Sequence, residues 1–290
     1  MDAPSSHMPD VTLPNGTELP ALGLGTWRLG ESAGLANAEV KSLRLALDMG
    51  YRVFDCAEMY GDGGAETVLG HALAQAQGQG LAREQIFAVS KFYPAHATVP
   101  GMVAACERSL RRLQLDHIDL YLLHWRGNVP LHDTVQGFEV LQRRGWIRHW
   151  GVSNFDLADL HELDAVPGGS GCAANQVWYS LSQRGVEHEL LPWQRLRQMP
   201  LMAYSPIDQG ELAQHQALSE LATSYDATPA QVALAWLLSH PGVMAIPKAV
   251  NPQHLRENWR AAHLQLDAED LRILDLEFAA PQRGQPLAMR

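Results

Sequence analysis

Apolar and polar positions along the chain follow two alternating patterns. Short apolar runs predict strands, and longer segments with apolar residues every three or four positions predict helices. The strands are expected at 21–26, 52–57, 86–92, 118–124, 147–154, 173–179, 200–206 and 243–249. The helices are expected at 37–49, 64–77, 98–113, 132–144, 156–164, 188–198, 228–239 and 252–260, with a further one at about 268–278. Ahead of them, Asn15–Gly16 in "VTLPNGTELP" predicts the turn of a β-hairpin.

Eight strand–helix repeats in this order indicate an α/β fold. The strand candidates are almost continuously apolar, as parallel strands buried on both faces are. A doubly wound open sheet is the competing architecture, but eight units in 290 residues favour a closed (β/α)8 (TIM) barrel. No linker or low-complexity segment interrupts the pattern, so residues 1–290 are predicted to form a single domain with an amino-terminal hairpin and an extra carboxy-terminal helix.

Composition narrows the classes of partner. The formal net charge is -10 and no basic block occurs, which argues against a nucleic-acid or anionic-membrane partner. "MDAPSSHMPD" lacks the apolar segment of a secretory signal, and the longest apolar stretch is broken by a His-Pro-Gly sequence. The scattered cysteines have no CxxC spacing and are expected to be free thiols: Cys56, Cys106 and Cys172. These features predict a soluble, cytoplasmic protein.

Hydrogen-bonding or ionisable residues stand at the ends of seven of the eight predicted strands. In a (β/α)8 barrel, function gathers at the carboxyl ends of the strands. A charge at the end of an apolar strand is costly unless it is paired. These residues are Asp55, Lys91, His124, Ser153 with Asn154, Gln176, Tyr204 and Lys248, and the first strand ends in Gly25–Thr26–Trp27.

Each of these residues also has a purely structural interpretation. Asp55 and Lys91 could form only a buried ion pair, and a lone His124 is more often a core histidine than a functional one. Tyr60 could simply cover the barrel rim, and the strand-end amides could be caps. Function is favoured only because all of them converge on one end of the barrel.

The convergence of Asp55, Tyr60, Lys91 and His124 suggests proton transfer. A phenol of pKa about 10 is a poor acid at neutral pH, and a neighbouring ammonium such as Lys91 lowers its pKa. Asp55 would hold Lys91 charged, and a neutral His124 could donate a hydrogen bond to a substrate oxygen. Such a site would protonate a developing alkoxide, as carbonyl reduction requires.

Hydride must then come from a cofactor, since no side chain supplies it; a nicotinamide or a flavin is implied. The Rossmann fingerprint is absent, because "GLGTWRLG" has Arg28 where the third glycine should stand. A different phosphate site is offered by Lys248 together with the helix that begins at Asn251–Pro252. His254 and Asn258 lie four apart on that helix and are expected to share a face.

With these residues placed, the sequence resembles the aldo-keto reductase superfamily. The motifs are "YRVFDCAEMYG", "VSKFYP", "SLRRLQLDHIDLYLLHW", "GWIRHWGVSNF", "NQVWYS", "MAYSP" and "IPKAVNPQHLREN", and they span nearly the whole chain. The resemblance implies a barrel that uses NADPH, or sometimes NADH, without a metal. It places the catalytic tetrad on Asp55, Tyr60, Lys91 and His124, with Tyr60 as the general acid.

The resemblance also implies cofactor and substrate contacts. Ser153, Asn154 and Gln176 match residues that bind the nicotinamide carboxamide, and Tyr204 matches the ring stacked on the nicotinamide. The full expected cofactor set is Thr26, Trp27, Asp55, Ser153, Asn154, Gln176, Tyr204, Ser205, Pro206, Lys248, His254, Glu257 and Asn258. The expected substrate pocket is Trp27, Tyr93, His124 and Trp125.

Two positions depart from the pattern of NADPH-selective members. Ala249 follows Lys248 where many carry serine, and His254 stands where they place an arginine against the 2′-phosphate. A mostly neutral histidine loses one charge-assisted contact. NADPH or NADP+ remains the expected cofactor because Lys248 is retained, but strict exclusion of NADH is not expected.

Short loops bear on the substrate. "RGNVPL" and the tail "APQRGQPLAMR" are brief, which predicts an open, shallow pocket. Within the family the chain is similar to bacterial reductases of the methylglyoxal-reductase type, so small aldehydes and 2-oxoaldehydes are the first expectation. An open mouth would also admit a bulkier ketone or secondary alcohol, and the direction of the reaction stays open. A monomer is implied by the resemblance alone.

Two further function classes have weaker support in the sequence. A non-catalytic, nucleotide-binding regulatory barrel is disfavoured by the complete tetrad. A metal-dependent hydrolase is suggested by thirteen histidines, but the chain has neither HExxH nor HxH, so no metal is expected.

Overall fold

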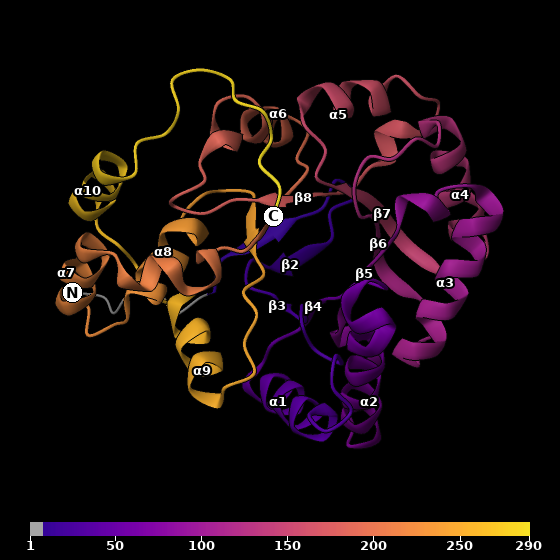
Figure 1. The fold of residues 1–290 in the computed structure, drawn as a ribbon, viewed down its shortest axis with the longest axis horizontal. Helices are drawn as coiled ribbons and strands as arrows, with labels where there is room; N and C mark the ends of the chain where they lie inside the picture. The colour runs from indigo at the N-terminus through magenta and orange to yellow at the C-terminus, as the bar shows by residue number, and fades with distance from the viewer. Residues whose placement is uncertain (1–7) are drawn as a thin grey trace.

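Eight parallel strands form one sheet in the computed structural model, which describes residues 8–290 apart from the side chain of Ala213 (Figure 1). Each strand pairs with the strands before and after it in the chain, as successive βα units require. The strands are β3 (Leu24–Gly25), β4 (Val53–Asp55), β5 (Phe87–Phe92), β6 (Ile118–Leu123), β7 (Ile147–Ser153), β8 (Asn175–Trp178), β9 (Leu201–Tyr204) and β10 (Val243–Ala245).

The sheet closes on itself between its first and last strands. Parallel bridges join Leu22 to Ala245 and Gly25 to Lys248, and the Gly25 amide donates to Pro247 O at 3.0 Å. A Cβ on Gly25 would lie 2.9 Å from the carbonyl oxygen of Ile246, so glycine permits this close approach. The closed (β/α)8 barrel is confirmed, and the open doubly wound sheet is excluded.

Helices surround the barrel as an outer layer (Figure 1). They are α1 (Ala36–Met49), α2 (Gly64–Gly78), α3 (Val99–Leu113), α4 (Leu131–Arg143), α5 (Leu157–Asp164), α6 (Leu190–Leu196), α7 (Gln216–Ser224), α8 (Pro229–Leu238), α9 (Pro252–Ala261) and α10 (Ala268–Glu277). The predicted caps form: Thr228 and Gln231 bond reciprocally at the start of α8, and Asn251 caps α9. Helix α7 was not predicted from the sequence.

The predicted hairpin is present and lies at the amino end of the barrel. Strands β1 (Asp10–Thr12) and β2 (Glu18–Pro20) pair antiparallel, and Gly16 in the turn has φ +89°. Leu13 is buried, and the adjacent Pro14 lines a cavity together with Cys172 and Met199, which precede β8 and β9. The hairpin therefore leaves the opposite end, where the strands finish, open for a site.

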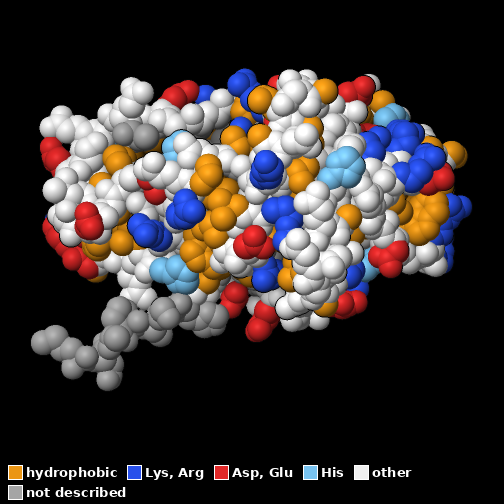
Figure 2. Space-filling model, turned by 90° about the horizontal axis from the view of Figure 1, so that it is seen from below, with side chains coloured by type: hydrophobic (Ala, Val, Ile, Leu, Met, Phe, Trp, Pro, Cys, Tyr) orange, Lys and Arg blue, Asp and Glu red, His pale blue; other side chains and the backbone are white. Residues whose placement is uncertain are grey.

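Burial and surface charge fit the sequence pattern. All six residues of β5 and all six of β6 are buried, including Lys91. On the face drawn in Figure 2, basic side chains lie at several separate places with acidic ones among them. None of the helices in the described part of the chain has the length and apolar character needed to cross a bilayer.

Candidate functional site

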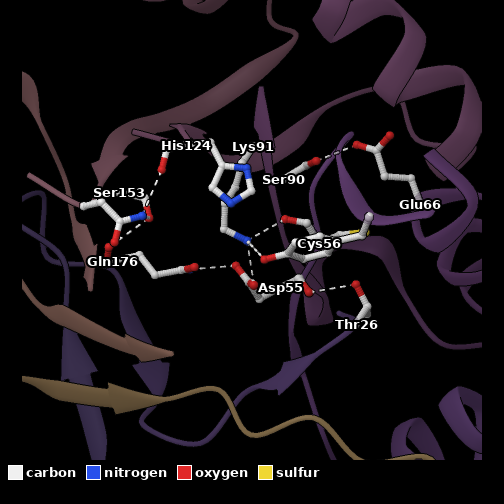
Figure 3. A network of polar contacts seen from close by, with 11 residues as sticks. Thr26, Asp55, Cys56, Glu66, Ser90, Lys91, His124, Ser153 and Gln176 are labelled. Carbon is white, nitrogen blue, oxygen red and sulfur yellow. Dashed lines mark hydrogen bonds and ion pairs between the residues drawn. The ribbon is translucent and has the colours of Figure 1, made fainter. Parts of the chain in front are cut away.

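Lys91, at the end of β5, is the centre of the polar network in Figure 3. Its side chain is fully buried, and its Nζ lies 2.7 Å from Asp55 Oδ2, 2.8 Å from Cys56 O and 3.2 Å from the Tyr60 hydroxyl. Three acceptors thus match the three donors of the ammonium group. The expected pairing of Asp55 with Lys91 is present, and it extends to Tyr60.

Tyr60 reaches Lys91 because the chain turns sharply after β4. The 3₁₀ helix Tyr60–Gly63 contains three left-handed residues, Gly61 at φ 59°, Asp62 at φ 53° and Gly63 at φ 84°. A Cβ on Gly61 would lie 2.9 Å from Leu29 O, so the turn packs closely against the loop after β3. This loop is what brings a phenol back over the strand ends.

The net effect on the Tyr60 phenol differs from the expectation. Burial raises the pKa of Tyr60 to about 12, although Lys91 acts to lower it. The expected direction of the Lys91 interaction is right, but desolvation outweighs it. The phenol therefore holds its proton at neutral pH. Burial also acts to lower the pKa of Lys91, but Asp55 and Tyr60 more than offset this and raise the pKa overall. The Lys91 ammonium therefore stays charged.

His124 follows β6 and meets Tyr60 edge to face, with ring centroids 5.8 Å apart. Burial, together with the charge of Lys91, lowers the pKa of His124 to about 3, so the imidazole is neutral. Its Nδ1 is buried without a hydrogen-bond partner among the described residues. A neutral imidazole therefore stands beside a protonated phenol.

Gln176 links the tetrad to the next strands. Its Nε2 donates to Asp55 Oδ1 at 2.8 Å, while its backbone carbonyl accepts from Ser153 Oγ at 2.9 Å. Thr26 Oγ1 donates to Asp55 O at 3.0 Å from the other side. Both flanks of Asp55 are thereby held, which fixes the carboxylate that pairs with Lys91.

Asn154 and Tyr204 extend this network across the barrel mouth. Asn154, left-handed at φ 58°, donates to His124 O at 3.2 Å. The Tyr204 hydroxyl donates to Asn154 Oδ1 at 3.0 Å. The strand ends of β6, β7 and β9 are thus joined by side-chain hydrogen bonds, as the shared position of their polar residues predicted.

The aromatic residues expected at the substrate pocket lie along the rim. Tyr93 and Trp125 meet edge to face with centroids 5.9 Å apart, and the Trp125 ring lies 5.0 Å from that of His124. Trp27, on the loop after β3, is 38 % exposed. The structure brings Tyr93, Trp125 and His124 together, with Trp27 on a separate loop.

The expected phosphate-binding residues lie where β10 leads into α9. Lys248 is exposed, and among the described residues its side chain has no ion-pair or hydrogen-bond partner. His254 and Asn258 lie four apart in α9 and so share a face, as expected, with His254 exposed and Asn258 buried. Glu257 accepts from Gln253 Nε2 at 2.8 Å.

The loop that connects β9 to α7 contains two of the expected cofactor contacts. It begins with Ser205, left-handed at φ 47°, and Pro206, and continues through a 3₁₀ helix over Asp208–Gln214. Buried Asp208 accepts from Trp178 Nε1 at 2.8 Å and from Ser180 Oγ at 2.9 Å. We name residues 205–215 the covering loop. Its anchor was missed because no periodic pattern marks Asp208, which contacts residues far earlier in the sequence.

A further buried carboxylate, Glu66, lies near the tetrad beside Ser90 (Figure 3). Glu66 accepts from Ser90 Oγ at 2.5 Å and from Arg112 Nε at 2.7 Å. These partners compensate its charge, so it braces β5 against α2 and α3. Within residues 8–290, no group of three or more His, Cys, Asp or Glu side chains could hold a metal ion.

Comparison with known proteins identifies the family. Residues 21–276 match the model of the aldo/keto reductase family. This chain belongs to that family. The chain is 47 % identical to the methylglyoxal reductase YeaE of Escherichia coli, over 93 % of this chain and 95 % of that one. It is 34 % identical to the glyoxal reductase of Bacillus subtilis, covering 94 % of each.

Solved structures of this family superpose on the whole barrel. An aldo/keto reductase of Klebsiella pneumoniae in complex with NADP and acetate gives a TM-score of 0.92 at 45 % identity, covering 97 % of this chain and 99 % of that one. A Klebsiella pneumoniae aldo-keto reductase in complex with NADPH gives 0.93 at 44 % identity, covering 98 % and 100 %. The fold expected for an aldo-keto reductase is confirmed over nearly the full chain.

Proposed function

We propose that this aldo/keto reductase reduces aldehydes and ketones to alcohols with NADPH. The observation that carries the proposal is the buried contact of Tyr60 with Lys91 at 3.2 Å, beside a neutral His124. A protonated phenol, a charged ammonium and a neutral imidazole gathered at one end of the barrel are suited to protonating a carbonyl oxygen.

Each member of the tetrad has a distinct part. Tyr60 holds the proton at its hydroxyl and donates it to the substrate oxygen, and Lys91 stabilises the phenolate that remains. Asp55 keeps Lys91 charged and oriented, and His124 donates a hydrogen bond to the same oxygen. NADPH, when bound, supplies the hydride that completes the reduction.

The residues present fit a nicotinamide dinucleotide. Ser153, Asn154 and Gln176 offer hydroxyl and amide groups for a carboxamide, and Tyr204 offers an aromatic ring. Lys248, exposed and unpaired among the described residues, and the start of α9 suit the 2′-phosphate of NADPH. The remaining proposed contacts are Thr26, Trp27, Asp55, Ser205, Pro206, His254, Glu257 and Asn258. The Klebsiella pneumoniae structures with NADP and NADPH support this choice of cofactor.

Small reactive aldehydes and 2-oxoaldehydes are the proposed substrates. The names of the relatives from Escherichia coli and Bacillus subtilis, a methylglyoxal and a glyoxal reductase, support this class. Trp27, Tyr93, His124 and Trp125 would line the pocket. The exposure of Trp27 favours an open mouth, so oxidation of a bulkier secondary alcohol with NADP+ is the alternative.

We further propose that residues 1–290 act as one domain and one subunit in the cytoplasm. The continuous barrel sheet supports the proposal of a single domain. The net charge of -10 supports the absence of a nucleic-acid partner.

One experiment tests the proposed function. A panel of aldehydes, 2-oxoaldehydes, ketones and secondary alcohols is run with NADPH, NADH and their oxidised forms, and nicotinamide absorbance is followed. We expect the highest kcat/KM for a small aldehyde with NADPH, and a fall of about 10²–10⁴-fold in Tyr60→Phe. Unchanged reduction by Tyr60→Phe would refute the assigned acid, and activity only on alcohols would support the alternative.

A further inference from the structure

The last twelve residues, 279–290, form a strap that is attached mainly at its two ends. In Figure 1 the strap leaves α10 and returns to the middle of the barrel. At its root, buried Arg184 donates to Phe278 O at 2.7 Å and pairs with Asp275 at 2.8 Å. Within the described chain, residues 279–290 make no backbone–backbone hydrogen bond. The strap is therefore anchored firmly at one end and depends on side chains at the other.

Between its ends the strap spans a hollow. A cavity of about 200 Å³ lies between residues 284–288 of the strap and the segments that carry Leu157, Trp178 and His188. Leu287 packs against the hydrophobic core, so a strap with space beneath it and no backbone ladder can separate from the body by giving up this one core contact. The contacts of its free end therefore govern whether the strap stays in place.

That free end is Arg290, which contacts Tyr204, a proposed nucleotide contact, and two further residues, Glu211 of the covering loop and Trp178 of β8. Its backbone amide donates to the Tyr204 hydroxyl at 3.2 Å, and its guanidinium pairs with Glu211 at 2.6 Å. The guanidinium also lies over the Trp178 ring, 5.0 Å from the centroid. Arg290 therefore joins the end of β9, the covering loop and the end of β8.

These contacts add to the anchor inside the covering loop. Asp208 already holds this loop to Trp178 and Ser180 by buried hydrogen bonds. Glu211, in the same loop, is mostly exposed, with 73 % of its side chain accessible, and Arg290 is the partner that holds it. The loop is thus held by buried contacts at Asp208 and Leu212 and by an exposed one at Glu211, and the exposed one can be released.

We propose that Arg290 is a positioning residue that latches the covering loop and Tyr204 over bound nucleotide, so that nucleotide release requires the strap to detach. The inference rests on the proposed function, because it takes Tyr204, Ser205 and Pro206 as nucleotide contacts. Arg290 acts through Tyr204 and Glu211 and takes no part in proton transfer.

The test is the dissociation rate of NADPH from the full chain. Protein loaded with NADPH is mixed in a stopped-flow instrument with excess NADP+, and the loss of nucleotide fluorescence gives koff. Arg290→Ala and Glu211→Gln each remove the exposed ion pair. Arg283→Ala is the matched control, since Arg283 lies exposed in the same strap and has no side-chain partner among the described residues.

We expect koff to rise about three- to tenfold in Arg290→Ala and less in Glu211→Gln, with Arg283→Ala unchanged. The double variant Arg290→Glu with Glu211→Arg should return koff toward the wild-type value. Melting temperatures of all variants should stay close to that of the wild type, because the ion pair lies at the surface.

Three outcomes have separate meanings. An unchanged koff in Arg290→Ala overturns the latch while leaving the reductase proposal intact. A rise in the association rate alone also overturns it, since the strap would then obstruct the empty site. Failure of the wild-type chain to bind NADPH at all contradicts the proposed function instead.

Discussion

Replacing Asp55 by asparagine should separate the structural from the functional role of the buried ion pair. The Asp55 and Lys91 side chains are 3 % and 0 % exposed and lie 2.7 Å apart. The amide would keep the shape of the side chain and a hydrogen-bonding group toward Gln176, but it would leave the ammonium without its counter-charge. Removing one partner of a buried pair costs about 3–5 kcal/mol of unfolding free energy.

This loss of unfolding free energy corresponds to a measurable decrease in Tm. With an unfolding entropy of roughly 2.1 cal/mol/K per residue, 290 residues give about 0.6 kcal/mol/K, so Tm should fall by about 5–8 °C. Burial acts to lower the pKa of Lys91, and Asp55 is the largest influence that opposes it. The Asp55→Asn variant should therefore lose the fixed ammonium near neutral pH, and kcat should acquire a new pH dependence there.

The assay is thermal unfolding by tryptophan fluorescence together with kcat measured at about pH 5 to 9, a range that spans neutrality. Asp119→Asn is the control, because Asp119 is 3 % exposed and pairs with Arg83 at 2.7 Å away from the tetrad. It should lower Tm without altering the pH profile. The reasoning fails if Asp55→Asn keeps the wild-type Tm, or if both variants change the pH profile alike.

The wild-type pH dependence follows from two perturbed groups. The pKa of His124 is about 3 and that of Tyr60 is about 12, so neither group should titrate at about pH 5 to 9. In that range kcat/KM for aldehyde reduction should therefore show no step from these groups. A clear step would mean that another group, or a bound nucleotide, controls the proton. The raised pKa of Lys91 contributes stability that is fully present below the usual lysine pKa of about 10.4 and is lost as the pH rises beyond it. The unfolding free energy, measured by denaturant titration, should therefore fall only at strongly alkaline pH. Finally, His254→Arg should tighten NADPH about 3- to 30-fold by adding a charge-assisted contact, with little change for NADH; equal effects on both Kd values would mean that residue 254 does not reach the 2′-phosphate.

Most limits of the barrel strands could be predicted from the sequence to within two residues. Asp55, Phe92 and Ser153 end β4, β5 and β7 in the structure, close to the predicted limits, because a polar residue or a turn breaks the apolar run there. The first strand was expected at 21–26 but is assigned only at Leu24–Gly25. Ladder length depends on which residues of the neighbouring strand lie opposite, and no local pattern contains that information.

The site was predictable where it lies on strands and less so where it lies on loops. The contacts of Lys91 with Asp55 and Tyr60 follow from strand-end positions and the short step to the next loop. By contrast, Asp208 and Arg290 act through partners distant in sequence, and their segments lack periodicity. Helix α7 was missed because only three residues of its nine, Leu218, Leu221 and Ala222, are buried. The net shift in the pKa of Tyr60 could not be predicted from the sequence either, because desolvation depends on all the residues packed around the ring.

Closure of the barrel at Gly25 and Lys248 has a consequence for how the protein matures. This contact joins residues separated by most of the chain, and contacts of such sequence separation are slow to form because the intervening chain must first be ordered. The proposed phosphate-binding lysine therefore takes its place only when the last strand docks against the first. A growing or truncated chain that has already brought Asp55, Tyr60 and Lys91 together would still lack this part of the nucleotide site. Nucleotide should then bind the completed barrel selectively and draw the folding equilibrium toward it.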